Sequence, residues 1–161
     1  MANTKRYLAL LVVLIGVVGV VLGAVFIGLA IQKESWIQDT ARLEKVTLGL
    51  TQEQINNGEV VDSPSKMQAA ADTIREHRRS IAPTYNDLLA QSGAKYDPAN
   101  PKDLYYAQAL NMENYLYLGV LSFGVTMVTK GVGAAFIVFG IALVIIGLLL
   151  FRELKATVKP G

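Results

Sequence analysis

Two long apolar stretches, residues 7–31 and 131–151, lie near the two ends of the chain, and neither contains a charged residue. An α-helix rises about 1.5 Å per residue, so the stretches would extend roughly 37 and 31 Å, enough to cross a hydrocarbon core of about 30 Å. The polar segment between them lacks the alternating pattern of long β-strands. The chain is therefore predicted to be an all-α integral membrane protein, with two transmembrane helices that extend into a small helical extracytoplasmic domain.

The charges next to the apolar stretches predict the orientation of the chain. The two tails carry five Lys or Arg and one Glu, whereas the segment between the spans carries ten Lys or Arg and twelve Asp or Glu. Basic residues close to membrane helices favour the cytoplasmic side. We therefore predict a multi-pass protein of the plasma (inner) membrane with both termini in the cytoplasm. The predicted segments are a cytoplasmic tail (1–6), a transmembrane helix (7–31), an extracytoplasmic domain (32–130), a second transmembrane helix (131–151) and a cytoplasmic tail (152–161).

The first apolar stretch also has features of a secretory signal peptide. Lys5 and Arg6 precede it, and small residues occur near its end at Gly28 and Ala30. However, its run of about 25 residues exceeds the 7–15 residues of a typical signal-peptide core. This length favours a retained membrane anchor.

Capping residues predict where the helices of the middle segment begin. The first membrane helix is expected to continue to about Lys45, and the sequence from Thr51 to Gln54 has the form of a capping box. Ser63 followed by proline predicts a helix that ends near Ile81, and a shorter helix is expected over residues 85–91.

A last helix start is expected at Asn100 and Pro101, with the Asp103 carboxylate reaching back to the helix cap. Beyond it, residues 115–129 are nearly as apolar as a span but too short to be one, and Lys130 separates them from the second span. They could form a third crossing, which would place the basic C-terminal tail outside, or an interfacial helix on the outer leaflet. We favour one long helix over residues 102–151, with Lys130 snorkelling to the outer surface.

Small residues recur every seven positions in both apolar stretches, and in the second stretch the period continues through Lys130. A smooth stripe of small side chains lets helices approach closely in lipid. Whether the stripes pack on each other or on neighbouring subunits is left open by the sequence. The predicted helix-packing positions are Ala9, Gly16, Gly19, Gly23, Ala30, Gly119, Gly133, Gly140 and Gly147.

Residues 115–129 also predict a protein interface, because apolar side chains cover most of the helix circumference. One small domain would bury about half of that surface, and apolar area left in water costs about 25 cal/mol per Å². We expect another subunit to cover the remainder. The predicted interface residues are Leu116, Leu118, Leu121, Phe123 and Val125.

A group of arginines is the main candidate for a ligand site. Arg75, Arg78 and Arg79 could bind an anion through their forked donors, or they could pair with nearby carboxylates. Glu113 is the last acid before the long apolar segment, and we expect it to pair with an arginine of the helix over residues 64–81. His77 is the single histidine, and we interpret it as a hydrogen-bonded residue at the edge of the domain.

The remaining features exclude several functions. There is no cysteine, no phosphate-binding glycine loop, no motif that implies a metal or cofactor, and no basic patch of the kind that binds nucleic acid. We therefore predict a structural or accessory membrane subunit, not an enzyme, that forms a homo-oligomer or scaffolds a larger complex with other membrane subunits and lipid. A membrane-anchored sensor that uses the arginines is the alternative. A small channel or transporter component ranks third, because the spans lack polar residues.

Overall fold

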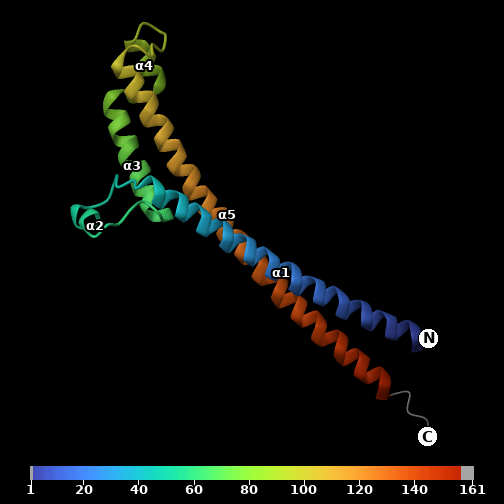
Figure 1. Cartoon of the computed structure of the whole chain (residues 1–161). Coiled ribbons are helices and arrows are strands. Elements are labelled where there is room, and N and C mark those ends of the chain that lie inside the picture. Colours follow the sequence, from blue (N-terminus) through green and yellow to red (C-terminus); the bar gives the residue numbers. More distant parts are fainter. Residues whose placement is uncertain (1, 157–161) are drawn as a thin grey trace. The chain divides into compact units, whose positions relative to one another are not determined.

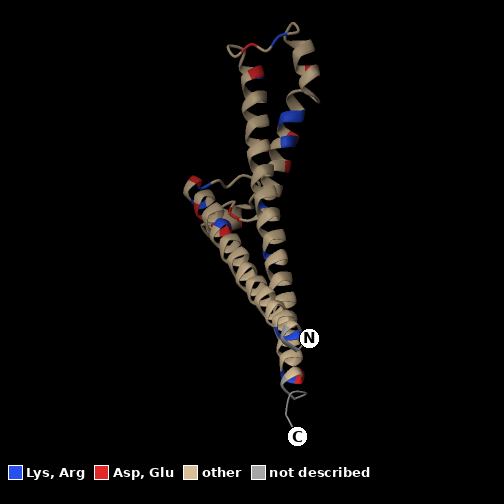
Figure 2. Ribbon diagram, turned by 90° about the vertical axis from the view of Figure 1, so that its right-hand side faces the viewer, with Lys and Arg blue, Asp and Glu red and all other residues tan. Residues whose placement is uncertain are grey.

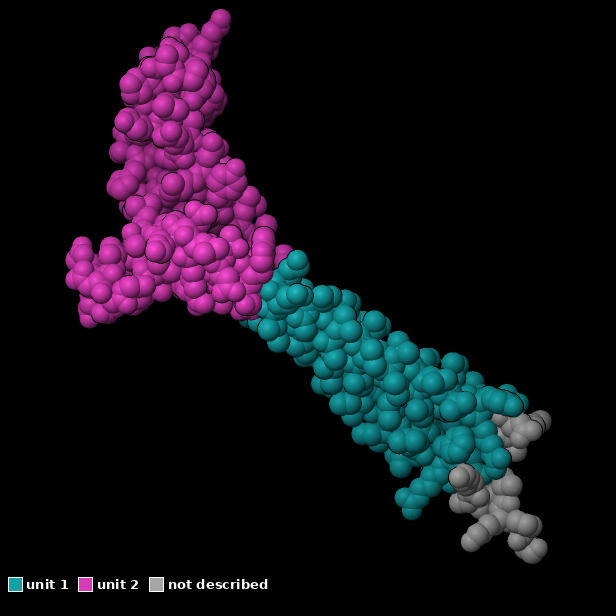
Figure 3. Space-filling view, in the orientation of Figure 1, with its two compact units in different colours: residues 1–33, 126–161 teal, residues 34–125 magenta. Residues whose placement is uncertain are grey.

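The computed structural model describes residues 2–156, and the side chains of residues 4–154. Every regular element in this part of the chain is an α-helix (Figure 1). The chain divides into a hairpin unit, which ends at Lys33 and resumes at Thr126, and a central unit, Glu34–Val125 (Figure 3). The helices are α1 (Ala2–Glu44), α2 (Gln52–Asn56), α3 (Pro64–Ile81), α4 (Tyr85–Gln91) and α5 (Pro101–Ala156).

In the hairpin unit, α1 and α5 pack against each other through glycines. A Cβ atom placed on Gly16 would lie 2.6 Å from the carbonyl oxygen of Gly140, and one placed on Gly23 would lie 2.4 Å from that of Gly133. One placed on Gly147 would lie 3.0 Å from the carbonyl oxygen of Ala9. Each step of seven residues forward in α1 thus matches seven residues backward in α5, so the two helices are antiparallel. We call this contact the glycine seam.

The outer surface of the hairpin is apolar. Long stretches of both helices carry no charged residue (Figure 2), and aliphatic side chains such as Leu14 and Val138 are 53% and 65% exposed. Both helices are long and apolar enough to cross a membrane, and only 11% of the most apolar window of each is buried. The core helix of a water-soluble protein would be mostly buried. Two candidate membrane-spanning helices packed as a hairpin are therefore present.

The central unit has its own core, built where α3 packs on α5. Val61 is buried there, and its N–H donates to the carbonyl of Val46 at 2.8 Å, which holds the loop before α3 in place. Gly49 has φ +77°, a backbone conformation that favours glycine, and a Cβ on it would make a tight contact of 3.0 Å with the Cα of Ala70. The core residues are Val61, Met67, Ala70 and Phe123, and a second cluster contains Ala82, Leu88 and Tyr106.

The predicted helix starts are confirmed. Thr51 and Gln54 form the capping box of α2, and Ser63 caps α3, whose first residue is proline. A second capping box, Thr84 with Asp87, starts α4 and was not predicted. Because α5 is one helix of 56 residues, no turn separates residues 115–129 from the span, which excludes a third crossing.

The hydrogen-bond partner predicted for the Asp103 carboxylate was wrong. This fully buried carboxylate does not reach back to the cap of α5 but accepts hydrogen bonds from the Ser92 hydroxyl at 2.5 Å and from the N–H of Asp97 at 3.0 Å. Asn100 starts the helix instead, by accepting from the N–H of Lys102. The loop between α4 and α5 folds over Asp103 because its donors converge there.

Substitution of Asp103 by asparagine is expected to weaken the central unit in a pH-dependent way. The hydrogen bonds from Ser92 and Asp97 lower the pKa of Asp103 below its ordinary value of 3.8. A lowered carboxyl pKa contributes stability that is present above the ordinary value and is lost as the pH falls through the folded value. Thermal unfolding followed by circular dichroism should therefore show D103N less stable at pH 7, with a smaller loss on acidification. An equal pH response in both proteins would contradict this, and E76Q, at an exposed position, is the control.

Candidate functional site

The central unit contains a buried ion pair between α3 and α5. Arg78 donates through Nε to Glu113 at 2.8 Å and through a terminal nitrogen to the Tyr106 hydroxyl at 2.6 Å. The guanidinium carbon also lies 5.1 Å from the centre of the Tyr106 ring. All three side chains are buried, and the hydrogen bond to Glu113 raises the pKa of Arg78 above its usual value. The pairing of Glu113 with an arginine of this helix matches the expectation from the sequence.

A second, more exposed group of the same kind lies beside it. The Tyr117 hydroxyl donates to Asp72 at 2.7 Å, and Arg75 pairs with the same carboxylate while lying 5.5 Å from the centre of the Tyr117 ring. Hydrogen bonds from Tyr117 and Gln68, with the charge of Arg75, lower the pKa of Asp72. Burial and the Asp72 carboxylate raise the pKa of Tyr117. Together with the Arg78 group, these contacts form the polar ladder between α3 and α5.

The polar ladder is closed within the chain. Among the described residues, no buried side-chain nitrogen or oxygen lacks a hydrogen-bond partner. Arg78 therefore joins α3 to α5, Arg75 pairs with Asp72 of its own helix, and Arg79 and His77 lie on the exposed side of α3. No group of three or more potential metal ligands occurs in the described part of the chain.

A groove of about 590 Å³ with several charged residues in its lining lies near α2 in the central unit. Arg42 and Lys66 contribute positive charge, but Arg42 bonds Asp62 at 2.8 Å and Lys66 pairs with Glu59 at 2.9 Å. Burial works to raise the pKa of Asp62, yet Arg42 and Lys66 outweigh it and the pKa is lowered. Three cations, Arg42, Lys45 and Lys66, thus line this groove with two carboxylates, and those carboxylates pair with Arg42 and Lys66.

The predicted interface residues of α5 point in two directions. Phe123 is buried in the core, and Leu116 packs against that core, so these two are not available to another subunit. Leu118, Leu121 and Val125 are 55%, 62% and 58% exposed. Tyr115, which was not among the predicted interface residues, is 73% exposed. We call the exposed set, Tyr115, Leu118, Leu121 and Val125, the α5 apolar face.

The predicted helix-packing positions also divide between partners. The six small residues Ala9, Gly16, Gly23, Gly133, Gly140 and Gly147 are buried in the hairpin unit, as is Ala30. Gly19 lies beside the seam, where a Cβ would be 3.4 Å from the Cα of Gly140, and borders an apolar groove of about 520 Å³. Gly119 belongs to the central unit, where a Cβ would lie 2.6 Å from the sulfur of Met67. The stripe of α5 therefore packs on α1 in one unit and on α3 in the other.

Reasoning from the sequence missed the roles of Tyr106 and Tyr117. The usable signal is spacing, because Tyr106, Glu113 and Tyr117 are separated by seven and four residues and so share one face of a helix. No family model matches the chain, and no curated protein or solved structure matches it. The proposal below therefore depends on the physical features of the chain itself.

Proposed function

We propose that this chain is a structural or accessory subunit of a membrane complex, anchored in the plasma (inner) membrane by the α1–α5 hairpin and presenting the central unit outside. Both termini would lie in the cytoplasm, as the basic tails favour. The α5 apolar face would bind a second copy of the chain. The single observation that carries the proposal is this face, exposed on a helix whose opposite side already packs in the core of the central unit.

Support for the membrane anchor comes from the apolar exterior of the hairpin. Exposed aliphatic side chains are stable in lipid and costly in water, at about 25 cal/mol per Å². The seam accounts for the packing of α1 along α5 without any hydrophobic driving force, because close backbone contact between small residues is how helices associate in lipid. This extended contact supports a retained anchor over a cleaved signal peptide.

The register of the hairpin indicates how deep each helix lies. Gly133 is level with Gly23, so Lys130, three residues earlier in α5, is level with Phe26 of α1. The uncharged stretch of α1 continues to Ile31. Lys130 would thus lie below the edge of the hydrocarbon layer, from which its long side chain can carry the ammonium group to the outer surface.

The same register supports a protein partner for the α5 apolar face. Ala30 of α1 is level with Thr126, and Val125 is the preceding residue of α5, so the hydrocarbon layer would end close to Val125 on α5. Leu121, Leu118 and Tyr115 follow at about 6, 10 and 15 Å farther along the helix. These distances reach through and beyond a headgroup region of about 5–8 Å per leaflet, so lipid tails do not cover this surface.

A sensor that binds an anion through the arginines has less support. Arg78 is held by Glu113 and Arg75 by Asp72, which leaves Arg79 as the arginine of that group on the exposed side of α3. The spans carry no charged side chain of the kind that lines an ion pathway, which weighs against a channel or transporter component.

Leu121→Glu is expected to prevent assembly while the monomer still inserts into the membrane. A carboxylate on the α5 apolar face would have to lose its hydration on association, which costs several kcal/mol. The measurement is native mass spectrometry of the full chain in mild detergent, with membrane flotation to verify insertion. Wild type should be oligomeric and the variant monomeric.

Asn86→Glu is the control variant. Asn86 is exposed on α4 and already polar, so a carboxylate there should leave the oligomer intact. If wild type is a monomer, or if L121E assembles as well as N86E, the α5 apolar face is not a subunit interface.

A further inference from the structure

A groove of about 440 Å³ opens at the end of the hairpin where α1 begins and α5 ends. The seam makes its last glycine contact at Gly147 with Ala9, and beyond it the ribbons of the two helices diverge (Figure 1). Both walls of the groove belong to the hairpin unit. The residues that line it are Lys5, Leu8, Ala9, Val12, Leu150, Glu153 and Leu154.

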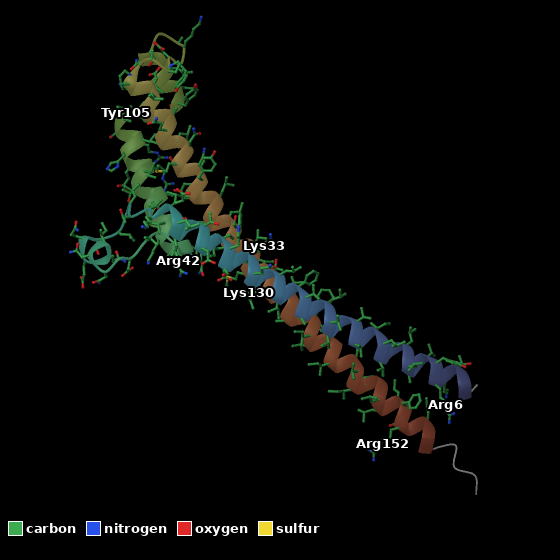
Figure 4. All side chains as sticks on the ribbon, in the orientation of Figure 1. Arg6, Lys33, Arg42, Tyr105, Lys130 and Arg152 are labelled. Carbon is green, nitrogen blue, oxygen red and sulfur yellow. The ribbon has the colours of Figure 1, made fainter. Side chains whose placement is uncertain are left out.

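The groove combines an apolar floor with charged side chains. Leu8, Val12 and Leu150 contribute aliphatic surface, whereas Lys5 and Glu153 contribute charged side chains to its lining. Arg6 follows Lys5 and is half-buried, and Arg152 precedes Glu153 and is exposed; both are labelled in Figure 4. Three cations thus accompany one carboxylate in the described part of this end, and the sequence adds Lys155 and Lys159.

We propose that this groove binds an anionic phospholipid. One acyl chain would lie along the aliphatic floor, and the phosphate would be held by Lys5 with Arg6 and Arg152 beside it. Basic pockets between membrane helices on the cytoplasmic side suit anionic headgroups, and forked guanidinium donors suit phosphate oxygens. The apolar floor selects a lipid over free phosphate, and the excess of cations selects an anionic headgroup over a zwitterionic one. The placement in the cytoplasmic leaflet rests on the proposed membrane orientation.

The test uses the purified full chain in mild detergent and native mass spectrometry. Phosphatidylglycerol and phosphatidylcholine with the same palmitoyl and oleoyl chains are added at equal concentration. Wild type should retain phosphatidylglycerol preferentially, and K5Q/R6Q should reduce that retention by about tenfold or more. Val12→Trp, which fills the floor and leaves the charges, should have a similar effect.

Two variants serve as matched controls. Lys33→Gln removes an exposed cation near the other end of the hairpin, and Val17→Trp adds the same bulk at an exposed position of α1. Both should retain phosphatidylglycerol as wild type does. Equal retention of the two lipids by wild type would overturn the proposal, as would loss of retention in both control variants. Displacement of the lipid by millimolar inorganic phosphate would also overturn it, because the site would then be one for free phosphate.

Failure of this inference can be told apart from failure of the proposed function. Lipid retention in detergent is measured regardless of orientation or oligomeric state. Orientation is read separately, from labelling of Asn57→Cys by a membrane-impermeant reagent in a chain that has no native cysteine. Retention of phosphatidylglycerol by a chain whose residue 57 is labelled only from the cytoplasmic side would support the site and contradict the proposed orientation.

Discussion

Glu113→Ala is expected to destabilise the packing of α3 on α5 by about 3–5 kcal/mol. The substitution leaves the Arg78 guanidinium buried without its carboxylate, and removal of one partner of a buried pair costs about this much. Protection of α3 amides against hydrogen exchange, measured on the full chain in detergent, should fall by about two to four powers of ten. A loss below about 1 kcal/mol would mean that water reaches the ion pair and that it is not a buried contact.

The double variant R78M/E113L separates the pair from its surroundings. Apolar residues of similar volume remove both charges together, and such replacements of buried pairs are often neutral or stabilising. The double variant should therefore be more stable than E113A alone. Arg79→Ala, at an exposed position of the same helix, should change stability by no more than about 0.5 kcal/mol.

Gly23→Ala is expected to separate the two helices of the hairpin. The added Cβ would lie 2.4 Å from the carbonyl oxygen of Gly133, and because that atom is backbone, α1 and α5 must move apart to accept it. Forced overpacking of this kind costs about 1–3 kcal/mol. The measurement is the rate of disulfide formation between Ala30→Cys and Thr126→Cys, which lie one seven-residue step along the seam from Gly23. This rate should be about tenfold lower when Gly23→Ala is also present.

Gly28→Ala is the matched control for the seam. No atom lies within 4 Å of the position that its Cβ would occupy, although it is a glycine of the same helix. Both substitutions raise helix propensity by up to about 1 kcal/mol, so the comparison isolates packing. Equal cross-linking rates in G23A and G28A would show that the close contact does not hold the hairpin together.

Local signals were sufficient to predict most of the helix bounds. The bounds of α3 are set by Ser63, which caps the helix before Pro64, and by Pro83, which follows its end. Each of these residues acts on the backbone of a single turn. The chain after Glu44 leaves the helix where expected, since Lys45 adopts φ +48° and Gly49 φ +77°. Such features depend on neighbours in the sequence and not on the fold.

The choice of partners could not be predicted in the same way. Arg75, Arg78 and Arg79 look alike in the sequence, and only the packing of α3 on α5 decides that Arg78 meets Glu113, which lies 35 residues away. Asp103 sits at a position that favours a helix cap. It faces donors from Ser92 and Asp97 instead, because the preceding loop folds back over it.

The sequence does not indicate which apolar side chains of α5 are buried and which are exposed, because they are so numerous. Where nearly every position is apolar, no periodicity separates the face that packs inside from the face that is exposed. Phe123 and Leu121 are therefore equivalent in the sequence but 6% and 62% exposed in the structure. The partner helix α3, and not the pattern along α5, distinguishes them.

The glycine seam specifies how close the two helices come but not where each stops along the other. If α5 slid by seven residues, about 10 Å, Gly16 would meet Gly133 and Ala9 would meet Gly140, and small residues would again face small residues. A periodic seam therefore allows several registers, seven residues apart, with similar packing. The contact between the Phe26 and Phe136 rings, with centres 5.9 Å apart, does not repeat with that period. Contacts of this kind therefore select one register of α1 against α5, and that register sets the depth of each helix.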